Sequence, residues 1–260
     1  MAASGQGQWT AIVLAGSRPG VDPLASHFGK KRKAMVKVAG RPMLAHVVDT
    51  LKDSPSIGRI VVLTRRVTKT AAKLPEEAQV VKTGNGISAS IIAAIEAEDA
   101  AFPILVTTAD HVLLTGAMVE EFLAKAKGDL SVAMVERSIY DRRFRGQKRT
   151  WLKLADGAWS GANLFALANP KVLPALRLWQ KAEQDRKKAR ALFRHFGPVL
   201  ALRALTRTIG LGEALQKAGR RLGLEAHLVA MSDPVAAIDV DKPADHRLAE
   251  RIFAEREKGG

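Results

Sequence analysis

Three aspartates occupy positions in which they could hold a cation. Asp110 comes two residues after the mainly apolar segment 103–108, and Asp239 and Asp241 end a second apolar run near the C-terminus. Carboxylate oxygens, together with phosphate oxygens, are the ligands that a hard cation such as Mg²⁺ prefers. An aspartate after a strand more often caps a helix or shapes a turn. The residue types therefore leave a cation site and a structural role both open.

A loop of small and basic residues is the second candidate site. It follows the apolar run 10–15 and ends in four cations at positions 30–33. Small residues allow backbone N–H groups to approach phosphate oxygens, and Arg and Lys neutralise the phosphate charge. The loop lacks the Gly-Lys-Ser/Thr of a P-loop and the Gly-x-Gly-x-x-Gly of a Rossmann nucleotide site. Phosphate binding and an ordinary solvated loop are equally consistent with these residues.

Two shorter segments place polar side chains beside glycine. Ser88 and Ser90 follow Gly86 at the start of a predicted helix. Free backbone N–H groups there could bind a ligand, or the serines could simply cap the helix. Gly161 and Asn163 lie in the segment 159–165, where Asn163 could hydrogen-bond a substrate or turn the chain into a strand. Both segments thus keep a functional and a structural interpretation.

Alternating strands and helices must position these residues. Short apolar runs predict strands over 10–15, 59–63, 79–81, 103–108 and 130–135. Helical spacing of apolar residues predicts helices over 42–51, 88–97 and 116–127. This alternation indicates βαβ units and a mostly parallel sheet. Such a sheet binds ligands beyond the carboxyl ends of its strands.

The pattern changes after residue 136. Residues 136–153 are polar and strongly basic and are predicted to form a loop. Asp156-Gly157 predicts a hairpin between short strands. Residues 171–221 are predicted to form a basic helical insertion, which Gly197-Pro198 breaks into separate helices.

The C-terminal part is predicted to complete the same unit. Strands are expected over 224–230 and 235–240, and a closing helix over 243–257. On a strand, Asp239 and Asp241 would point to one face, because side chains alternate. Asp245, in the first turn of the closing helix, is expected to be structural. We therefore expect a single α/β domain over residues 1–260.

The composition narrows the class of protein. The chain has 260 residues, 47% of them hydrophobic, which excludes a disordered or collagen-like protein. Its 41 Lys and Arg against 26 Asp and Glu give a net charge of +15, which favours anionic partners. The absence of cysteine excludes disulfides and thiolate sites. Without a secretory leader or an apolar run of ~18 residues, the chain is expected to be cytoplasmic.

The N-terminal residues resemble those of a known enzyme family. The motif of the MobA-like nucleotidyltransferases is matched by two segments, Val13-Leu14-Ala15-Gly16 and Lys33-Ala34-Met35-Val36-Lys37-Val38-Ala39-Gly40-Arg41-Pro42-Met43-Leu44. The resemblance, which covers most of residues 9–166 and 224–257, implies a Rossmann-like α/β sandwich of three layers, the glycosyltransferase A-type fold. It also implies an enzyme that condenses an NTP with a phosphorylated acceptor and releases pyrophosphate.

The resemblance implies a role for each candidate residue. Nucleotide binding would involve Leu14, Ala15, Gly16, Ser17, Lys33, Gly86 and Ser90. The catalytic residues would be Lys33, which matches the family's phosphate-binding lysine, with Arg18 and Asp110. Mg²⁺ would be held by Asp110 and Asp241, with Asp239 as a further ligand. The acceptor would be contacted by Gly161 and Asn163.

Other classes of function stay open at this level. A glycosyltransferase of related fold would use a nucleotide-sugar, but would be expected to carry Asp-x-Asp where only Asp110 is found. The charge also suggests a non-enzymatic protein that binds nucleic acid or membranes, although an aromatic content of 5% argues against nucleic acid. Residues 186–207 alternate apolar with basic side chains, so their apolar face either contacts an anionic membrane or packs within the protein. We favour packing for Phe193 and Phe196.

Overall fold

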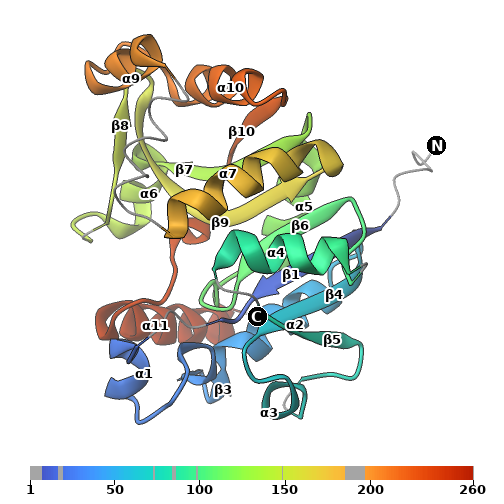
Figure 1. Ribbon diagram of the computed structural model, residues 1–260. Coiled ribbons are helices and arrows are strands. Elements are labelled where there is room, and N and C mark those ends of the chain that lie inside the picture. Colours follow the sequence, from blue (N-terminus) through green and yellow to red (C-terminus); the bar gives the residue numbers. More distant parts are fainter. Residues whose placement is uncertain are drawn as a thin grey trace, which may run out of the picture.

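A sheet that draws strands from both halves of the chain forms the centre of the structure (Figure 1). The computed structural model describes residues 8–16, 20–72, 74–83, 86–97, 99–147, 149–184 and 197–259. Within these ranges the sheet has eight strands, seven of them in the order β10-β7-β9-β6-β1-β4-β5, with β8 paired to β9. The strands are β1 (Trp9–Leu14), β4 (Ile57–Thr64), β5 (Ala78–Lys82), β6 (Ile104–Thr108), β7 (Leu130–Glu136), β8 (Leu152–Leu154), β9 (Gly157–Leu167) and β10 (Ala226–Ala230).

One strand of this sheet runs against its neighbours. β1 is parallel to β4 and β6, β4 to β5, and β7 to β10, whereas β9 is antiparallel to β6, β7 and β8. Ile104 of β6 pairs with Leu167 and Val106 with Phe165. The first half of β9 therefore lies at the edge of the sheet where β1 and β6 end. The predicted, mostly parallel sheet is confirmed.

Helices cover both faces of the sheet. On one face, α2 (Met43–Lys52), α5 (Gly116–Lys125) and α11 (Pro243–Gly259) pack over the larger apolar core. On the other, α4 (Ile87–Glu96) and α7 (Leu173–Gln184) lie side by side (Figure 1). A separate, smaller apolar core joins β8 and β9 to α9 (Pro198–Leu205) and α10 (Leu211–Arg221). The predicted three-layer α/β fold is confirmed.

The short elements complete the chain. They are α1 (Pro23–His27), η1 (Lys33–Met35), β2 (Lys37–Val38), β3 (Arg41–Pro42), α3 (Val67–Ala71), α6 (Arg137–Phe144), η2 (Pro170–Val172) and η3 (Pro234–Ala237), where η marks a 3₁₀ helix. β2 and β3 form a separate two-stranded antiparallel sheet.

Most of the predicted elements are present. Every strand and helix predicted before residue 136 occurs within two residues of its expected bounds, although α1 and α3 were not expected. The hairpin at Asp156-Gly157 is formed by β8 and β9. α9 begins at Pro198, directly after the predicted break. The predicted strand 224–230 and closing helix 243–257 correspond to β10 and α11.

The predicted loop over 136–153 is partly wrong, because it contains the helix α6. Tyr140 and Phe144 are four residues apart and both are buried, with ring centroids 5.2 Å apart. Arg137 Nε donates to Asp141 Oδ2 at 3.0 Å, also four residues along. Side chains at this spacing share one helical face. The surrounding arginines concealed this short apolar stripe in the sequence.

The predicted strand over 235–240 is wrong. Its first part forms the 3₁₀ helix η3, which begins at Pro234, and the Asp233 carboxylate accepts the Val235 N–H at 2.8 Å. Proline at the first helical position and a capping aspartate favour a helical start. The apolar run Val235, Ala236, Ala237 and Ile238 is buried throughout, so it looks like a core strand in the sequence.

The basic segment 171–221 contains α7, α9 and α10. Of these, α9 exposes Val199, Leu202 and Leu205, which are 66%, 60% and 81% exposed. Phe193 and Phe196, predicted to be packed inside, lie outside the described residues, as does 186–196. Membrane contact of 186–207 stays the alternative to this packing. None of the described helices combines the length and apolar character that crossing a membrane would require.

Two glycines of α10 test whether this helix is docked on the sheet. A Cβ on Gly219 would lie 2.7 Å from Ala226 Cβ and 2.9 Å from the Leu224 carbonyl oxygen, whereas one on Gly212 would contact nothing. Gly219→Ala should lower the free energy of unfolding by ~1–3 kcal/mol, because backbone must move. Gly212→Ala should cause no loss, since alanine is the better helix former. Urea unfolding of both variants measures this, and equal stabilities would contradict the close packing.

Candidate active site

The ammonium group of Lys33 lies between two of the predicted carboxylates. Lys33 opens η1, and its Nζ donates to Asp110 Oδ2 at 2.5 Å and to Asp241 Oδ1. Asp110 and Asp241 lie 77 and 208 positions further along the chain than Lys33. The fold thus brings together the three residues for which the resemblance implied phosphate and metal binding.

Backbone hydrogen bonds fix the segments that carry these side chains. Asp110 follows β6, and the Ala109 N–H donates to the Leu14 carbonyl oxygen at 3.0 Å. The Asp110 carbonyl oxygen in turn accepts the Val240 N–H at 3.1 Å. The end of β1, the turn after β6 and the segment before α11 are therefore tied in a row at the carboxyl edge of the sheet.

Asp245 holds the backbone on which Asp241 sits. Its Oδ2 accepts the N–H groups of Asp241 and Lys242 at 3.1 and 2.9 Å, at the start of α11. Asp245 therefore has the structural role expected for it. The Asp241 side chain is 55% exposed, so it is open to a ligand while its backbone is held.

Asp239 is held by a different cation. Its Oδ1 accepts a hydrogen bond from Arg149 Nη2 at 3.0 Å, and its side chain is 27% exposed. Because no strand forms here, the alternation that was expected to align Asp239 with Asp241 does not apply. Among the described residues, no three Asp, Glu or His side chains are arranged closely enough to form a complete metal site.

The charges at the site are incompletely balanced. Burial raises the pKa of Asp239, and the negative charges of Asp241 and Asp110 raise it further against the opposing effect of Arg149. Burial lowers the pKa of Lys33, but the charges of Asp110 and Asp241 and their hydrogen bonds outweigh this, so that its pKa is raised. Lys33 is therefore a firmly protonated cation between two carboxylates.

One oxygen of the cluster is left without a partner. Asp110 Oδ1 is buried and forms no hydrogen bond among the described residues. A buried, unpaired carboxylate oxygen costs free energy unless a donor or a cation meets it. Its oxygen chemistry and the neighbouring carboxylates fit a hard cation such as Mg²⁺.

The predicted nucleotide-binding residues lie along the same edge. Leu14 ends β1, and the N–H of Ala15 donates to the Leu63 carbonyl oxygen at 2.9 Å. Gly16 lies beside Thr83, which follows β5: a Cβ on Gly16 would be 3.7 Å from the Thr83 methyl group. Ser17 and Arg18 lie outside the described residues, so the nucleotide-binding and catalytic roles predicted for them stay predictions.

The start of α4 follows β5, at the same edge of the sheet as Gly16. Gly86 caps this helix with φ of +114°, a conformation that favours glycine. The Ser90 hydroxyl is buried and donates to the Gly86 carbonyl oxygen at 2.6 Å. The Ser88 N–H donates to Glu183 Oε2 of α7 at 3.2 Å. Ser90 is thus engaged within the helix, and its contact with a nucleotide stays a prediction.

Asn163 lies on β9, beyond its last residue pair with β6, on a strained piece of backbone. It has φ of +49°, and the register between β7 and β9 shifts nearby, between Val132 and Met134. Continuing the β6 pairing places Asn163 opposite Thr108, two residues before Asp110. Gly161, two residues earlier, is exposed. Positive φ at a residue other than glycine occurs more often at functional sites.

Comparison with known proteins decides the family. A family model described as the MobA-like NTP transferase domain matches residues 11–205, which is most of the chain. The chain belongs to this family. The matched range includes Lys33 and Asp110 and stops before Asp241. No curated protein sequence matched significantly.

Solved structures agree with this assignment to the MobA-like NTP transferases. A hypothetical transferase from Thermus thermophilus is 29% identical, with a TM-score of 0.78, over 92% of this chain and 99% of that one. A nucleotidyl transferase from Methanothermobacter is 17% identical, with a TM-score of 0.58, over 96% and 100%. The 2-C-methyl-D-erythritol 4-phosphate cytidylyltransferase of Thermus thermophilus is 15% identical, with a TM-score of 0.53, over 95% and 99%. Because the last two structures are only 17% and 15% identical to this chain, their similarity shows the fold alone.

Two groups of residues in this MobA-like NTP transferase were not found from the sequence. Arg149 was one of several cations in a basic segment, and nothing in the spacing singled it out. The Thr107 and Thr108 hydroxyls, at the end of β6, are buried without a hydrogen-bond partner among the described residues. Their place in the predicted strand, just before Asp110, was the only available signal.

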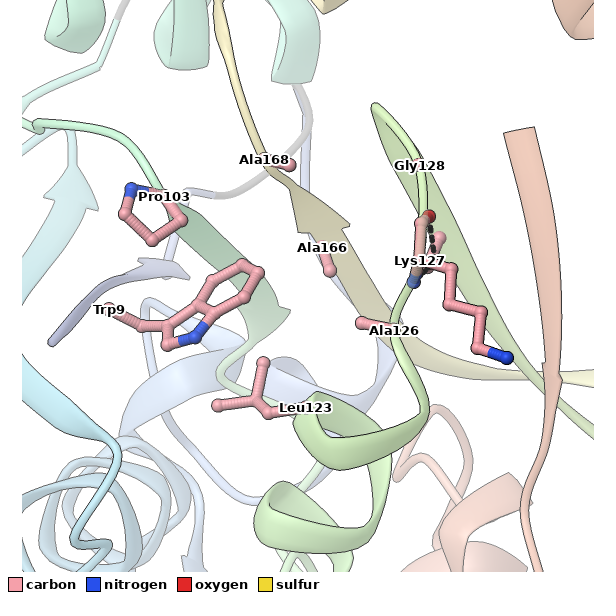
Figure 2. A pocket seen from close by; sticks show the side chains of 9 residues that line it. Trp9, Pro103, Leu123, Ala126, Lys127, Gly128, Ala166 and Ala168 are labelled. Atoms are coloured by element: carbon pink, nitrogen blue, oxygen red, sulfur yellow. Dashed lines mark hydrogen bonds between the residues drawn. The ribbon is translucent and has the colours of Figure 1, made fainter. Parts of the chain in front are cut away.

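A pocket at the other end of the sheet is separate from this site. It has a volume of about 290 Å³, and Trp9, Pro103 and Leu123 form much of its wall (Figure 2). Trp9 begins β1 and Pro103 precedes β6, so the pocket lies at the amino ends of the strands. The carboxylates and Lys33 lie at the carboxyl ends of the strands, so the pocket does not belong to the candidate active site.

His111, next to Asp110, should make the protein sensitive to acid. It is fully buried, and burial lowers the pKa of its ring to about 4, against a smaller opposing effect of the Asp110 charge. In the unfolded chain a histidine binds a proton below about pH 6.5, whereas the buried ring does so only near 4. Stability should therefore fall as the pH drops through this window.

His111→Leu should remove much of that pH dependence. Neither ring nitrogen makes a hydrogen bond of good geometry among the described residues, and the backbone of Ala236 contributes only a minor interaction, so leucine should nearly preserve the free energy of unfolding at pH 7. At pH 4.5 the variant should be the more stable protein by roughly 2–3 kcal/mol. Urea unfolding at both pH values measures the difference, and parallel curves for the two proteins would contradict the buried neutral ring.

Proposed function

We propose that this nucleotidyltransferase transfers the NMP part of an NTP to a phosphorylated small-molecule acceptor, with Mg²⁺ as cofactor. The observation that carries the proposal is the position of Lys33 between Asp110 and Asp241 at the carboxyl edge of the sheet. A cation that can bind phosphate and carboxylates that can bind a metal are thereby placed within one site. This is the combination that phosphoryl transfer requires.

The roles of the residues follow from their charge and place. Lys33 would bind the triphosphate, with Arg18 and the backbone of residues 14–17 beside it. Gly86 and Ser90 would lie on the nucleoside side, and Gly161 and Asn163 on the acceptor side. An acceptor oxygen would form the new bond to the α-phosphorus as the bond to pyrophosphate breaks. Positioning and charge neutralisation suffice for this, and no covalent intermediate with the protein is needed.

The carboxylates would hold the metal. Asp110 offers a buried oxygen without a partner, Asp241 an exposed carboxylate, and Asp239 a further one close by. A bound Mg²⁺ would neutralise the phosphate charge that develops during transfer. Burial, and after it the repulsion from Asp241 and Asp110, raises the pKa of Asp239, which supports a site that is completed by a cation.

Two observations support a phosphorylated acceptor. The net charge of +15 favours two phosphorylated substrates, the nucleotide and its acceptor. One structure of similar fold is an enzyme whose name specifies a phosphorylated acceptor, 2-C-methyl-D-erythritol 4-phosphate. A panel of the four NTPs against sugar phosphates and polyol phosphates, with pyrophosphate release as the signal, would identify both substrates.

The alternative functions give different products. A glycosyltransferase of related fold would release a nucleoside diphosphate from a nucleotide-sugar rather than pyrophosphate from an NTP. A non-enzymatic binding protein would bind oligonucleotides in a strongly salt-dependent way and turn over no NTP. Membership of an NTP transferase family favours the proposed reaction over both.

Asp110→Asn should abolish NTP turnover while the protein stays folded. The change keeps the size of the side chain but removes the charge that would bind the metal. Pyrophosphate release measures turnover, and thermal unfolding confirms the fold. Turnover equal to that of the natural protein, with normal unfolding, would contradict the role of Asp110.

Lys33→Ala should reduce turnover or NTP affinity by ~10- to 1,000-fold, the loss expected for ~1.4–4 kcal/mol of stabilisation. Lys31→Ala is the matched control, because Lys31 is exposed two residues away and should matter less. Arg32 is less suitable as a control because its Nη1 donates to Thr70 Oγ1 at 2.6 Å. If Lys31→Ala were the more damaging change, the assignment of Lys33 would be wrong.

A further inference from the structure

Arg149 is held on three sides at the border of the carboxylate cluster. Its Nε donates to Ser160 Oγ of β9 at 2.7 Å, and its Nη2 donates to Asp239 Oδ1 at 3.0 Å. Its guanidinium carbon lies 5.9 Å from the centre of the Tyr140 ring in α6. The side chain is only 16% exposed. A long, flexible side chain is thus fixed in one place.

The other described cations of the same segment are placed differently. Arg137 pairs with Asp141 at 3.0 Å and Arg143 with Glu255 at 2.7 Å, and their side chains are 51% and 44% exposed. Arg142 and Arg145 are exposed as well. Among residues 137–147 and 149, therefore, Arg149 is the cation that reaches an aspartate of the site.

The two hydrogen bonds come from one edge of a rigid group. Guanidinium is planar and presents its N–H groups in a fixed fork, which an ammonium group lacks. One bond ends on the central sheet and the other on the segment between η3 and α11. The backbone of this segment is fixed at Val240, whose N–H donates to the Asp110 carbonyl oxygen at 3.1 Å, and the fork adds a link from the sheet to the Asp239 side chain itself.

We propose that Arg149 is a positioning residue, which ties the Asp239 carboxylate to Ser160 and so keeps it beside Asp110 and Asp241. The proposal deepens the proposed function, on which it rests, by assigning a residue that acts through Asp239 and not on the substrate. Residues that orient metal ligands typically contribute 10- to 100-fold to metal affinity or activity.

The test compares R149M, D239N and the double variant, with R143M as the matched control from the same segment. Mn²⁺ binding, measured by electron paramagnetic resonance with the metal alone, and the kcat and KM of NTP turnover are the readouts. R149M should weaken Mn²⁺ binding and lower kcat by ~10- to 100-fold, with little change in the KM for NTP. R143M should match the natural protein in both.

The double variant decides whether Arg149 acts through Asp239. If it does, R149M should cause no further loss once D239N is present, because the carboxylate that it positions is already neutral. Losses that multiply in the double variant, or R149M with unchanged Mn²⁺ affinity and kcat, would overturn the proposal. R149K, which keeps the charge but not the fork, should show an intermediate loss and serves if R149M does not fold.

The same measurements separate this proposal from the proposed function. If the natural protein turned over no NTP, the proposed function would fail, while Mn²⁺ affinity would still report on Arg149. If NTP were turned over but R149M kept full Mn²⁺ affinity and kcat, the positioning role alone would fail.

Discussion

The attraction between the Lys33 ammonium and two carboxylates is the interaction on which the site depends. Asp110 and Asp241 belong to segments 77 and 208 positions further along the chain, and Lys33 is the charge between them. Like charges in a partly buried site repel each other unless a cation lies among them. Under the proposed function, a triphosphate that drew Lys33 toward itself would leave the carboxylates in need of another cation. Under that function, anion binding and cation binding at this site would be linked through the Lys33 side chain.

The backbone supplies the rigidity that this linkage needs. The Leu14 carbonyl accepts the Ala109 N–H, the Asp110 carbonyl accepts the Val240 N–H, and Asp245 fixes the N–H groups before α11. The first two bonds join segments that are remote in sequence, and the Asp245 bonds fix the local turn before α11. The charged side chains thus extend from a frame that is already closed, and only their ends need to move when a ligand binds.

The sequence was informative wherever one pattern dominated a segment. β1, β4 and β6 were predicted because their apolar runs are continuous. Lys33 was predicted because the family motif includes it, and Asp110 and Asp241 because they follow apolar runs. The strand predicted over 235–240 was wrong because a buried 3₁₀ helix is as apolar as a buried strand. α6 was missed because four arginines surround Tyr140 and Phe144. Arg149 could not be found, since only three-dimensional distances to Asp239 and Ser160 distinguish it from its basic neighbours.

The reversed direction of β9 determines where this fold can change without harm. Because β9 starts at the carboxyl edge, the chain that precedes it, including α6 and β8, lies at the same edge of the sheet as the site. The chain that follows it leaves at the opposite edge, and α7 then returns along α4 until Glu183 meets the Ser88 N–H. Insertions or deletions in the connection between β7 and β9, which contains α6 and β8, would therefore change the chain beside the site. The loop after β1 would stay as it is. Under the proposed function, variation of this one connection would change the acceptor side of the site and leave the end that would bind the triphosphate as it is.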